Sequence, residues 1–243
     1  MGIPNWSGLY HQRRGKRLRY GNTQPTANSL PSAELVLALL IILIITVACF
    51  NMAFLMSPGL PVTANPASRI VFLQENTLVW QLGWLTWMAS AIGLLTFSFM
   101  LLTYIPHSTF RHFGLALIAI GIGPDLTAET LYAFVLPEIS HVSTFNVIDR
   151  IAMLLTGLVG NGAYCLGGLI LNWLLLGNPR LPRSVIYFGL PSWLVGLAIS
   201  LATAINQIHY AAVFTGVAMV WNVIWMFIFS LVVIRNKSSY QVK

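Results

Sequence analysis

The sequence predicts an all-α integral membrane protein in which six transmembrane helices form one bundle. Hydrophobic residues make up 57% of the chain and charged residues 8%, whereas soluble domains are about half apolar and about a quarter charged. Six apolar segments each exceed the roughly 20 residues that cross a hydrocarbon core about 30 Å thick. They are Ala33–Leu55, Leu78–Ile105, Phe113–Leu136, Ile148–Leu176, Val185–Asn206 and Ala211–Ile234.

The distribution of Lys and Arg residues predicts how these helices are oriented. With the N-terminus in the cytoplasm, only Arg69 and Arg150 of the 13 basic residues fall outside. Because cytoplasmic segments of membrane proteins carry an excess of Lys and Arg, we expect both the N-terminus and the C-terminus to be cytoplasmic. The basic residues expected inside are Arg13, Arg14, Lys16, Arg17, Arg19, Arg111, Arg180, Arg183, Arg235, Lys237 and Lys243.

Three regions are expected along the 243 residues. Residues 1–31 combine Gly, Pro, Asn and Gln with five clustered basic residues, which predicts a disordered cytoplasmic tail. Residues 32–235 form the transmembrane domain, and residues 236–243 a short cytoplasmic tail. The net charge of +7 lies mostly in tails and cytoplasmic loops, so the expected partner of the basic tail is the anionic lipid headgroups of the bilayer rather than nucleic acid. The small, simple chain favours a bacterial cytoplasmic or thylakoid-type membrane.

Capping residues predict where two of the helices begin. Ser32 is a suitable N-cap for the first helix, with Glu34 in its positively polarised first turn. In the fourth helix, Asn146 with Asp149 three residues later resembles a capping box.

The connection between the first and second helices is the longest. It runs from residue 56 to residue 77 and contains Pro58, Gly59, Pro61 and Pro66. Clustered Pro and Gly residues are typical of loops. We therefore expect an extended, irregular segment rather than a helix.

The third helix carries two acids about halfway along its length. Asp125 and Glu129 are four residues apart and share one helix face, which Tyr132 continues. An ionised Asp at the centre of a membrane helix costs about 2.5–3.5 kcal/mol even on lenient scales, so both should face the bundle interior. Gly123 and Pro124 precede the acids, and Pro removes a backbone hydrogen bond. The helix is expected to be kinked or broken near Pro124.

The acids predict a site that binds or translocates a proton, a small cation or a cationic ligand. Buried acids in membrane helices usually mark such pathways, and no Lys or Arg lies near the middle of a span to neutralise them. Tyr132, Gln81, Asn161 and Tyr164 are the expected polar neighbours in this ligand- or ion-binding site, and we expect no cofactor and no bound metal. A structural alternative is that both acids only join helices through hydrogen bonds. The partners for that alternative are Thr127, Thr130, Asn161 and Gln81.

Other interpretations also follow from the sequence. Trp84 and Trp87 in the second helix fill the bundle or anchor it at the membrane interface, or else line a cavity for an apolar ligand. The whole chain could instead be an accessory or assembly subunit whose acids meet a basic protein partner in the membrane. An enzyme that modifies lipids is less well supported, because no nucleophile or metal-binding motif is present. Glu138, His141 and Asp149 lack the spacing of a metal site.

Overall fold

The structure, a computed structural model, describes residues 32–235, so the two predicted tails lie outside it. The described residues form helices and no strand. Six helical segments are long and apolar enough to cross a bilayer, which confirms the predicted fold class of an all-α integral membrane protein. They are Ala33–Leu55, Thr77–Leu102, Thr109–Glu138, Val142–Gly177, Arg183–Ala204 and Ile208–Ile234.

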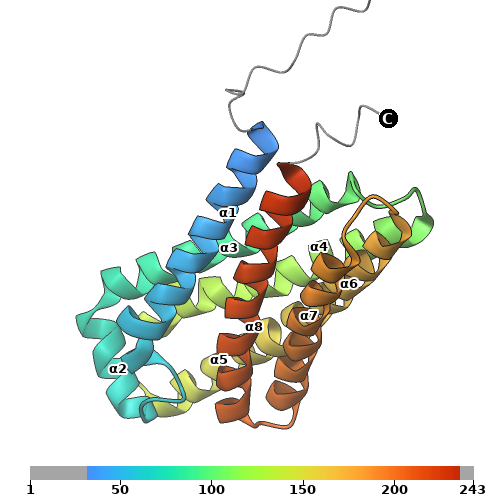
Figure 1. Ribbon diagram of the computed structural model, residues 1–243. Helices are drawn as coiled ribbons and strands as arrows, with labels where there is room; N and C mark the ends of the chain where they lie inside the picture. Colours follow the sequence, from blue (N-terminus) through green and yellow to red (C-terminus); the bar gives the residue numbers. More distant parts are fainter. Residues whose placement is uncertain (1–31, 236–243) are drawn as a thin grey trace, which may run out of the picture. The chain divides into compact units, whose positions relative to one another are not determined.

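The spans combine α-helices with shorter segments of other helix types (Figure 1). The α-helices are α1 (Ala33–Phe50), α2 (Pro66–Glu75), α3 (Thr77–Leu102), α4 (Thr109–Thr130), α5 (Val142–Met153), α6 (Asn161–Leu174), α7 (Arg183–Ala204) and α8 (Ile208–Phe229). The π-helical segments are η1 (Asn51–Leu55), η3 (Leu131–Val135), η5 (Leu154–Gly160) and η7 (Ser230–Ile234). The 3₁₀ segments are η2 (Ser57–Gly59), η4 (Leu136–Glu138) and η6 (Leu175–Gly177).

The bundle has two ends, which we name by what they hold. The described chain begins with α1 and ends with η7 on the same side (Figure 1), here called the termini side. The opposite side, here called the far side, holds α2, the start of α5 and the turn between α7 and α8. The first helix begins as predicted, because the Ser32 hydroxyl accepts a hydrogen bond of 3.3 Å from the Leu35 amide.

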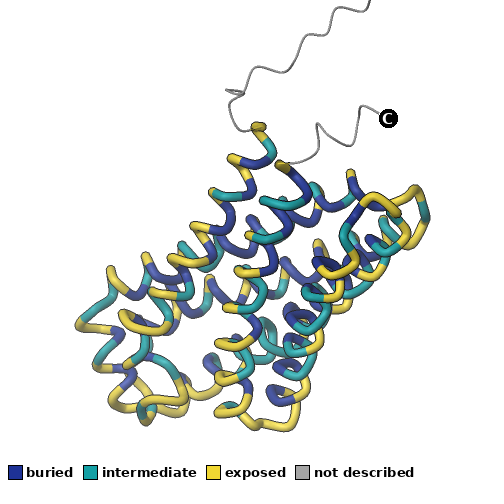
Figure 2. The backbone as a smooth tube through the Cα atoms, in the orientation of Figure 1, coloured by how far each residue is buried: buried dark blue, intermediate teal, exposed yellow. Residues whose placement is uncertain are grey.

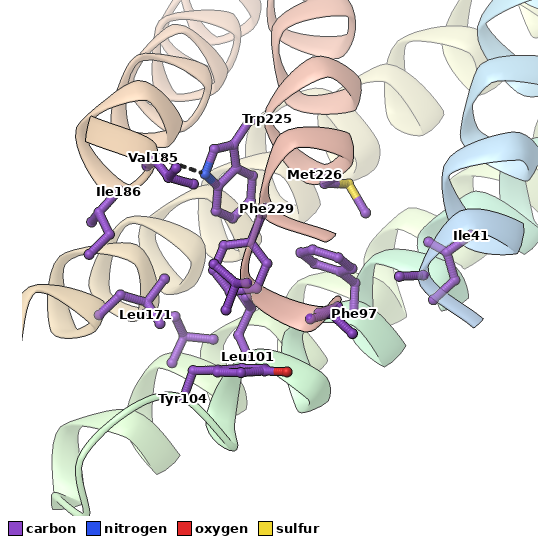
Figure 3. Close-up of a cluster of buried hydrophobic side chains, with 14 of the residues drawn as sticks. Ile41, Phe97, Leu101, Tyr104, Leu171, Val185, Ile186, Trp225, Met226 and Phe229 are labelled. Atoms are coloured by element: carbon purple, nitrogen blue, oxygen red, sulfur yellow. Dashed lines mark hydrogen bonds between the residues drawn. The ribbon is translucent and has the colours of Figure 1, made fainter. Parts of the chain in front are cut away.

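An aromatic cluster fills the core towards the termini side (Figure 3). Phe97 of α3 meets Trp225 and Phe229 of α8 edge to face, at 6.0 Å between ring centroids in both pairs. The Trp225 indole also donates a hydrogen bond of 3.0 Å to the Val185 carbonyl of α7. Buried aromatic rings contribute large contact areas, so this cluster holds α3, α7 and α8 together.

Each span has a buried side and a side covered by exposed apolar residues (Figure 2). Leu43, Ile92, Ile120 and Val220 are all more than half exposed, although each lies near the middle of a span. Such a surface would be unfavourable in water, whereas acyl chains are as apolar as these side chains. The outward residues are therefore suited to contact with lipid.

Glycine residues bring the backbones of α4 and the fourth span close together. A Cβ atom on Gly121 would lie 2.6 Å from the Gly160 carbonyl oxygen, and one on Gly160 would lie 2.9 Å from the Gly121 carbonyl oxygen. Gly114 and Gly167 form a second close pair seven residues away on both helices. Small residues permit such approach between membrane helices. The glycines thus fix the position of the acidic part of α4 against η5.

The prediction of an irregular connection between residues 56 and 77 is wrong, because most of this segment is helical. α2 begins at Pro66, and the Asn65 side chain caps it by accepting a hydrogen bond of 2.9 Å from the Ser68 amide. The N–H group at the first helical position has no partner within the helix, so a proline, which lacks this group, is well tolerated there. Pro66 therefore starts a helix here rather than preventing one.

Two further predictions about helix ends need correction. The fourth span begins at Val142, so Asn146 and Asp149 lie inside α5 and form no capping box. α4 continues through Pro124 without a break, and the departure from α-helix comes later, at η3. A kink at Pro124 remains a prediction.

Candidate functional site

Asp125 and Glu129 both lie inside the bundle. Asp125 is 4% exposed and Glu129 is 0% exposed. Neither carboxylate is paired with a Lys or Arg side chain within residues 32–235. The burial agrees with the energetic argument that placed both acids away from lipid.

The Asp125 carboxylate has one hydrogen-bond partner among the described side chains. The Thr156 hydroxyl of η5 donates to Asp125 Oδ1. Gly160 lies one turn beyond Thr156. A Cβ atom on Gly160 would lie 3.1 Å from the Cβ of Asp125. The glycine therefore leaves room for Asp125 to reach Thr156. Sequence reasoning missed Thr156, since no spacing rule pairs a residue of the fourth span with one of the third.

Glu129 is placed differently from Asp125. Neither of its carboxylate oxygens has a hydrogen-bond partner within the described part of the chain. A buried carboxylate without a partner is costly when ionised. Glu129 is therefore an unsatisfied buried group that lies one helical turn from the better-satisfied Asp125.

A cavity of about 540 Å³ lies beside Asp125. Its wall is mostly apolar and is built from α1, α3, α4, α6, α7 and α8 together with η5. Asp125, Tyr132, Asn161 and Tyr164 line it, whereas the predicted site residues Glu129 and Gln81 do not. The cavity therefore brings together four of the six predicted site residues and leaves two outside.

Aromatic side chains of α3 form part of the same wall. The Trp84 ring stacks on the Tyr132 ring, with 4.4 Å between centroids and 8° between planes. The neighbouring Trp80 indole donates a hydrogen bond of 2.7 Å to the Tyr132 carbonyl. Trp87 also lines the cavity. Of the two interpretations of these tryptophans, the arrangement favours the wall of an apolar cavity.

Asn161 joins two helices and does not bond to the acids. Its amide nitrogen donates to the Gly196 carbonyl and, at 2.8 Å, to the Ser200 hydroxyl, both on α7. Thr127 and Thr130 donate to carbonyl groups of their own helix and are exposed. The hydrogen bonds proposed in the structural alternative are thus not formed by Asn161, Thr127 or Thr130.

Three other residues that line the cavity carry buried polar atoms without partners in the described part of the chain. These atoms are Trp84 Nε1, Trp193 Nε1 and Asn222 Oδ1. Buried polar groups are nearly always hydrogen-bonded, so each exception needs an explanation. Apolar walls with a few polar groups are typical of sites for small molecules.

A buried ion pair lies on the far side, next to one end of the cavity. Arg69 of α2 donates to both carboxylate oxygens of Asp149 of α5, at 2.9 and 2.7 Å. The Arg69 Nε donates a further hydrogen bond of 2.8 Å to the Gly59 carbonyl, and its guanidinium lies 4.9 Å from the centre of the Phe145 ring. Leu60 and the three residues after it line the cavity, so Arg69 positions the segment that reaches its far-side end.

Two cysteine thiols also belong to the site. Cys49 and Cys165 both line the cavity and are not joined by a disulfide. Within residues 32–235, no three His, Cys, Asp or Glu side chains come together as metal ligands would.

Comparisons of the chain with family models, with curated proteins and with solved structures found no match.

Proposed function

We propose that this membrane protein binds a ligand with a cationic group inside its helix bundle, and that Asp125 supplies the counter-charge. The observation that carries the proposal is the position of Asp125 in the wall of a largely apolar cavity of about 540 Å³. Among the residues that the structure describes, its one hydrogen-bond partner is the neutral hydroxyl of Thr156. A cation would compensate the carboxylate charge, which Thr156 only solvates.

The size and lining of the cavity favour an organic cation over a bare metal ion. Pockets for small molecules typically have volumes of about 300–1,000 Å³. Hard metal cations need about six or more oxygen ligands, and the mostly apolar wall does not offer them. Aromatic rings such as those of Trp84 and Tyr132 also attract organic cations through their faces. Glu129 lies outside the wall, so its charge would act on the ligand only from a distance.

The accessory function is less well supported. It requires a basic side chain of a protein partner to reach Asp125 or Glu129. Both carboxylates are buried within the bundle itself, and Glu129 is fully enclosed. A partner would therefore have to insert a long side chain into the cavity rather than dock on a surface.

The proposed orientation keeps both termini in the cytoplasm, so that the far side is external. The positive-inside rule supports this orientation. Among the Lys and Arg residues within 32–235, only Arg69 and Arg150 belong to the far side, and the charge of Arg69 is compensated by Asp149. Arg150 is thus the single basic residue there without a carboxylate partner among the described residues.

Binding of a small probe cation tests the function. The full chain is reconstituted in lipid nanodiscs, and binding of radiolabelled benzyltrimethylammonium is measured against its uncharged isostere neopentylbenzene as competitor. We expect Asp125→Asn to weaken binding at least about tenfold, which corresponds to about 1.4 kcal/mol. Glu138→Gln is the matched control, since it removes an exposed acid from the same span.

Two results would contradict the proposal. One is equal affinity of Asp125→Asn and wild type for benzyltrimethylammonium, with both proteins folded by size-exclusion chromatography. The other is equal competition by neopentylbenzene, because a neutral isostere gains nothing from a carboxylate.

A further inference from the structure

The wall of the cavity extends to the lipid-facing surface between α1 and α8. Ala212, Gly216 and Val220 of α8 line the cavity and are also exposed. They are four residues apart and so form one stripe along the helix. Ala53 of η1 is an exposed lining residue on the other flank. Since these residues lie within membrane spans, the opening that they border faces the bilayer.

The packing of α8 explains why this opening exists. Near the termini side, Phe229 and Val233 share the main core with Ile41 of α1. Towards the far side, the buried residues of α8 form a small separate cluster with α7 alone, which includes Ala211 and Ala218. Figure 1 shows α1 and α8 close together at the termini side and farther apart towards the far side. A Cβ on Gly216 would meet no atom within 4 Å, so the flank of α8 is open there.

We propose that the ligand is a single-chain cationic amphiphile that enters from the bilayer between α1 and α8. This inference rests on the proposed function and adds the class of ligand and its route. The cationic head lies at Asp125, and the chain extends along the opening towards α1 and α8. Ile45, Met52 and Met219 line that part of the wall. Methionine side chains adapt to chains of varied shape.

Several features of the site suit such an occupant. An amphiphile already dissolved in the bilayer needs no aqueous entrance, and the far-side end is occupied by the segment that Arg69 fixes through Gly59. The cavity volume of about 540 Å³ lies within the range typical of pockets that bind one small molecule. One carboxylate in a mostly apolar wall matches one charged head on an apolar chain.

Protection of Cys49 from a maleimide provides the assay. Cys49 lies in the wall on the α1 side, and Cys165→Ser leaves it as the remaining cysteine of the chain. The reagent is N-ethylmaleimide, and the protectors are dodecyltrimethylammonium and the short benzyltrimethylammonium. We expect the dodecyl compound to halve the labelling rate at a concentration at least about tenfold lower, because its chain also binds.

Substitutions on α8 test the route. Gly216→Trp should fill the opening and raise the protecting concentration of dodecyltrimethylammonium at least about tenfold, while protection by benzyltrimethylammonium changes less than about threefold. Gly216→Leu is a smaller second variant that should act in the same direction. Val217→Trp is the matched control, since Val217 is exposed on α8 but does not line the cavity.

The outcomes separate the inference from the function on which it rests. If both probes need Asp125 but the dodecyl chain brings no gain, the amphiphile is wrong and the cation site stands. If Gly216→Trp and Val217→Trp have the same effect, the route between α1 and α8 is wrong. If neither probe protects Cys49 and Asp125→Asn leaves benzyltrimethylammonium binding unchanged, both proposals fall.

Discussion

Arg69 and Asp149, 80 positions apart in the sequence, form a buried bidentate ion pair with N–O distances of 2.9 and 2.7 Å. The same guanidinium holds the Gly59 carbonyl at 2.8 Å. One side chain thus joins η2, α2 and α5 at the far-side end of the cavity. Because all of these groups are shielded from solvent, the pair is sensitive to the loss of either partner.

The first prediction concerns this pair. Arg69→Ala leaves a buried carboxylate without its partner, and breaking a buried pair in this way typically costs about 3–5 kcal/mol. We expect a large drop in the free energy of unfolding, measured by thermal or denaturant unfolding in mild detergent. The double variant Arg69→Met with Asp149→Leu should recover much of the loss, since no unpaired charge remains.

Arg150 offers the control for this experiment. It follows Asp149 on the same helix, but its hydrogen bond to Asn206 is exposed. Exposed polar pairs contribute about 0–1 kcal/mol. Arg150→Ala should therefore have little effect, and an equal effect of Arg69→Ala and Arg150→Ala would show that burial of the pair is unimportant.

The second prediction compares two glycines of α4. Gly121→Ala places a methyl group 2.6 Å from the Gly160 carbonyl oxygen, so the helices must move apart. Overpacking of this kind typically costs about 1–3 kcal/mol. At Gly123 a Cβ meets nothing within 4 Å, and Ala there should be neutral or stabilise the helix by up to about 1 kcal/mol. Unfolding of both variants in the same detergent gives the comparison, and equal stabilities would contradict the close packing.

Much of the fold follows from local properties of the sequence. A span is recognised from its length and hydropathy, which do not depend on any distant contact. The inward position of Asp125 and Glu129 follows equally directly, because exposure of either acid to lipid is expensive. The cap at Ser32 is also predictable from the sequence, since its partner Leu35 is only three residues away.

What could not be predicted depends on distant partners. The clustered Pro and Gly residues predict a loop at Pro66. The sequence does not reveal that Asn65 caps a helix there, or that Arg69, one turn later, is buried against Asp149. Thr156 was missed for the same reason. Thr156 contacts Asp125 because glycines bring the backbones of α4 and η5 close together. The sequence indicates that these glycines favour close helix packing, but it does not indicate which helix they pack against.

The third prediction is a change of stability at high pH. Burial, followed by the nearby Glu34 carboxylate, raises the pKa of Tyr104 from 10.0 to about 12. The folded state therefore retains the phenol proton more tightly than the unfolded state. This contribution is fully present below pH 10 and is lost as the pH rises towards 12. Tyr104→Phe should lose less stability over that interval than the wild type, and parallel curves for the two proteins would contradict the assignment.

The fourth prediction tests how Thr156 prepares the site. Thr156→Val keeps the shape of the side chain but removes the hydroxyl that donates to Asp125. A hydrogen bond to a charged group contributes about 1.5–3 kcal/mol, so we expect benzyltrimethylammonium to bind about tenfold more weakly. Thr156→Ser should restore the affinity. Thr203→Val is the control, because Thr203 lines the same cavity but donates only to the Ile199 carbonyl of its own helix. Equal affinities of Thr156→Val and Thr203→Val would mean that the carboxylate needs no hydroxyl to receive the cation.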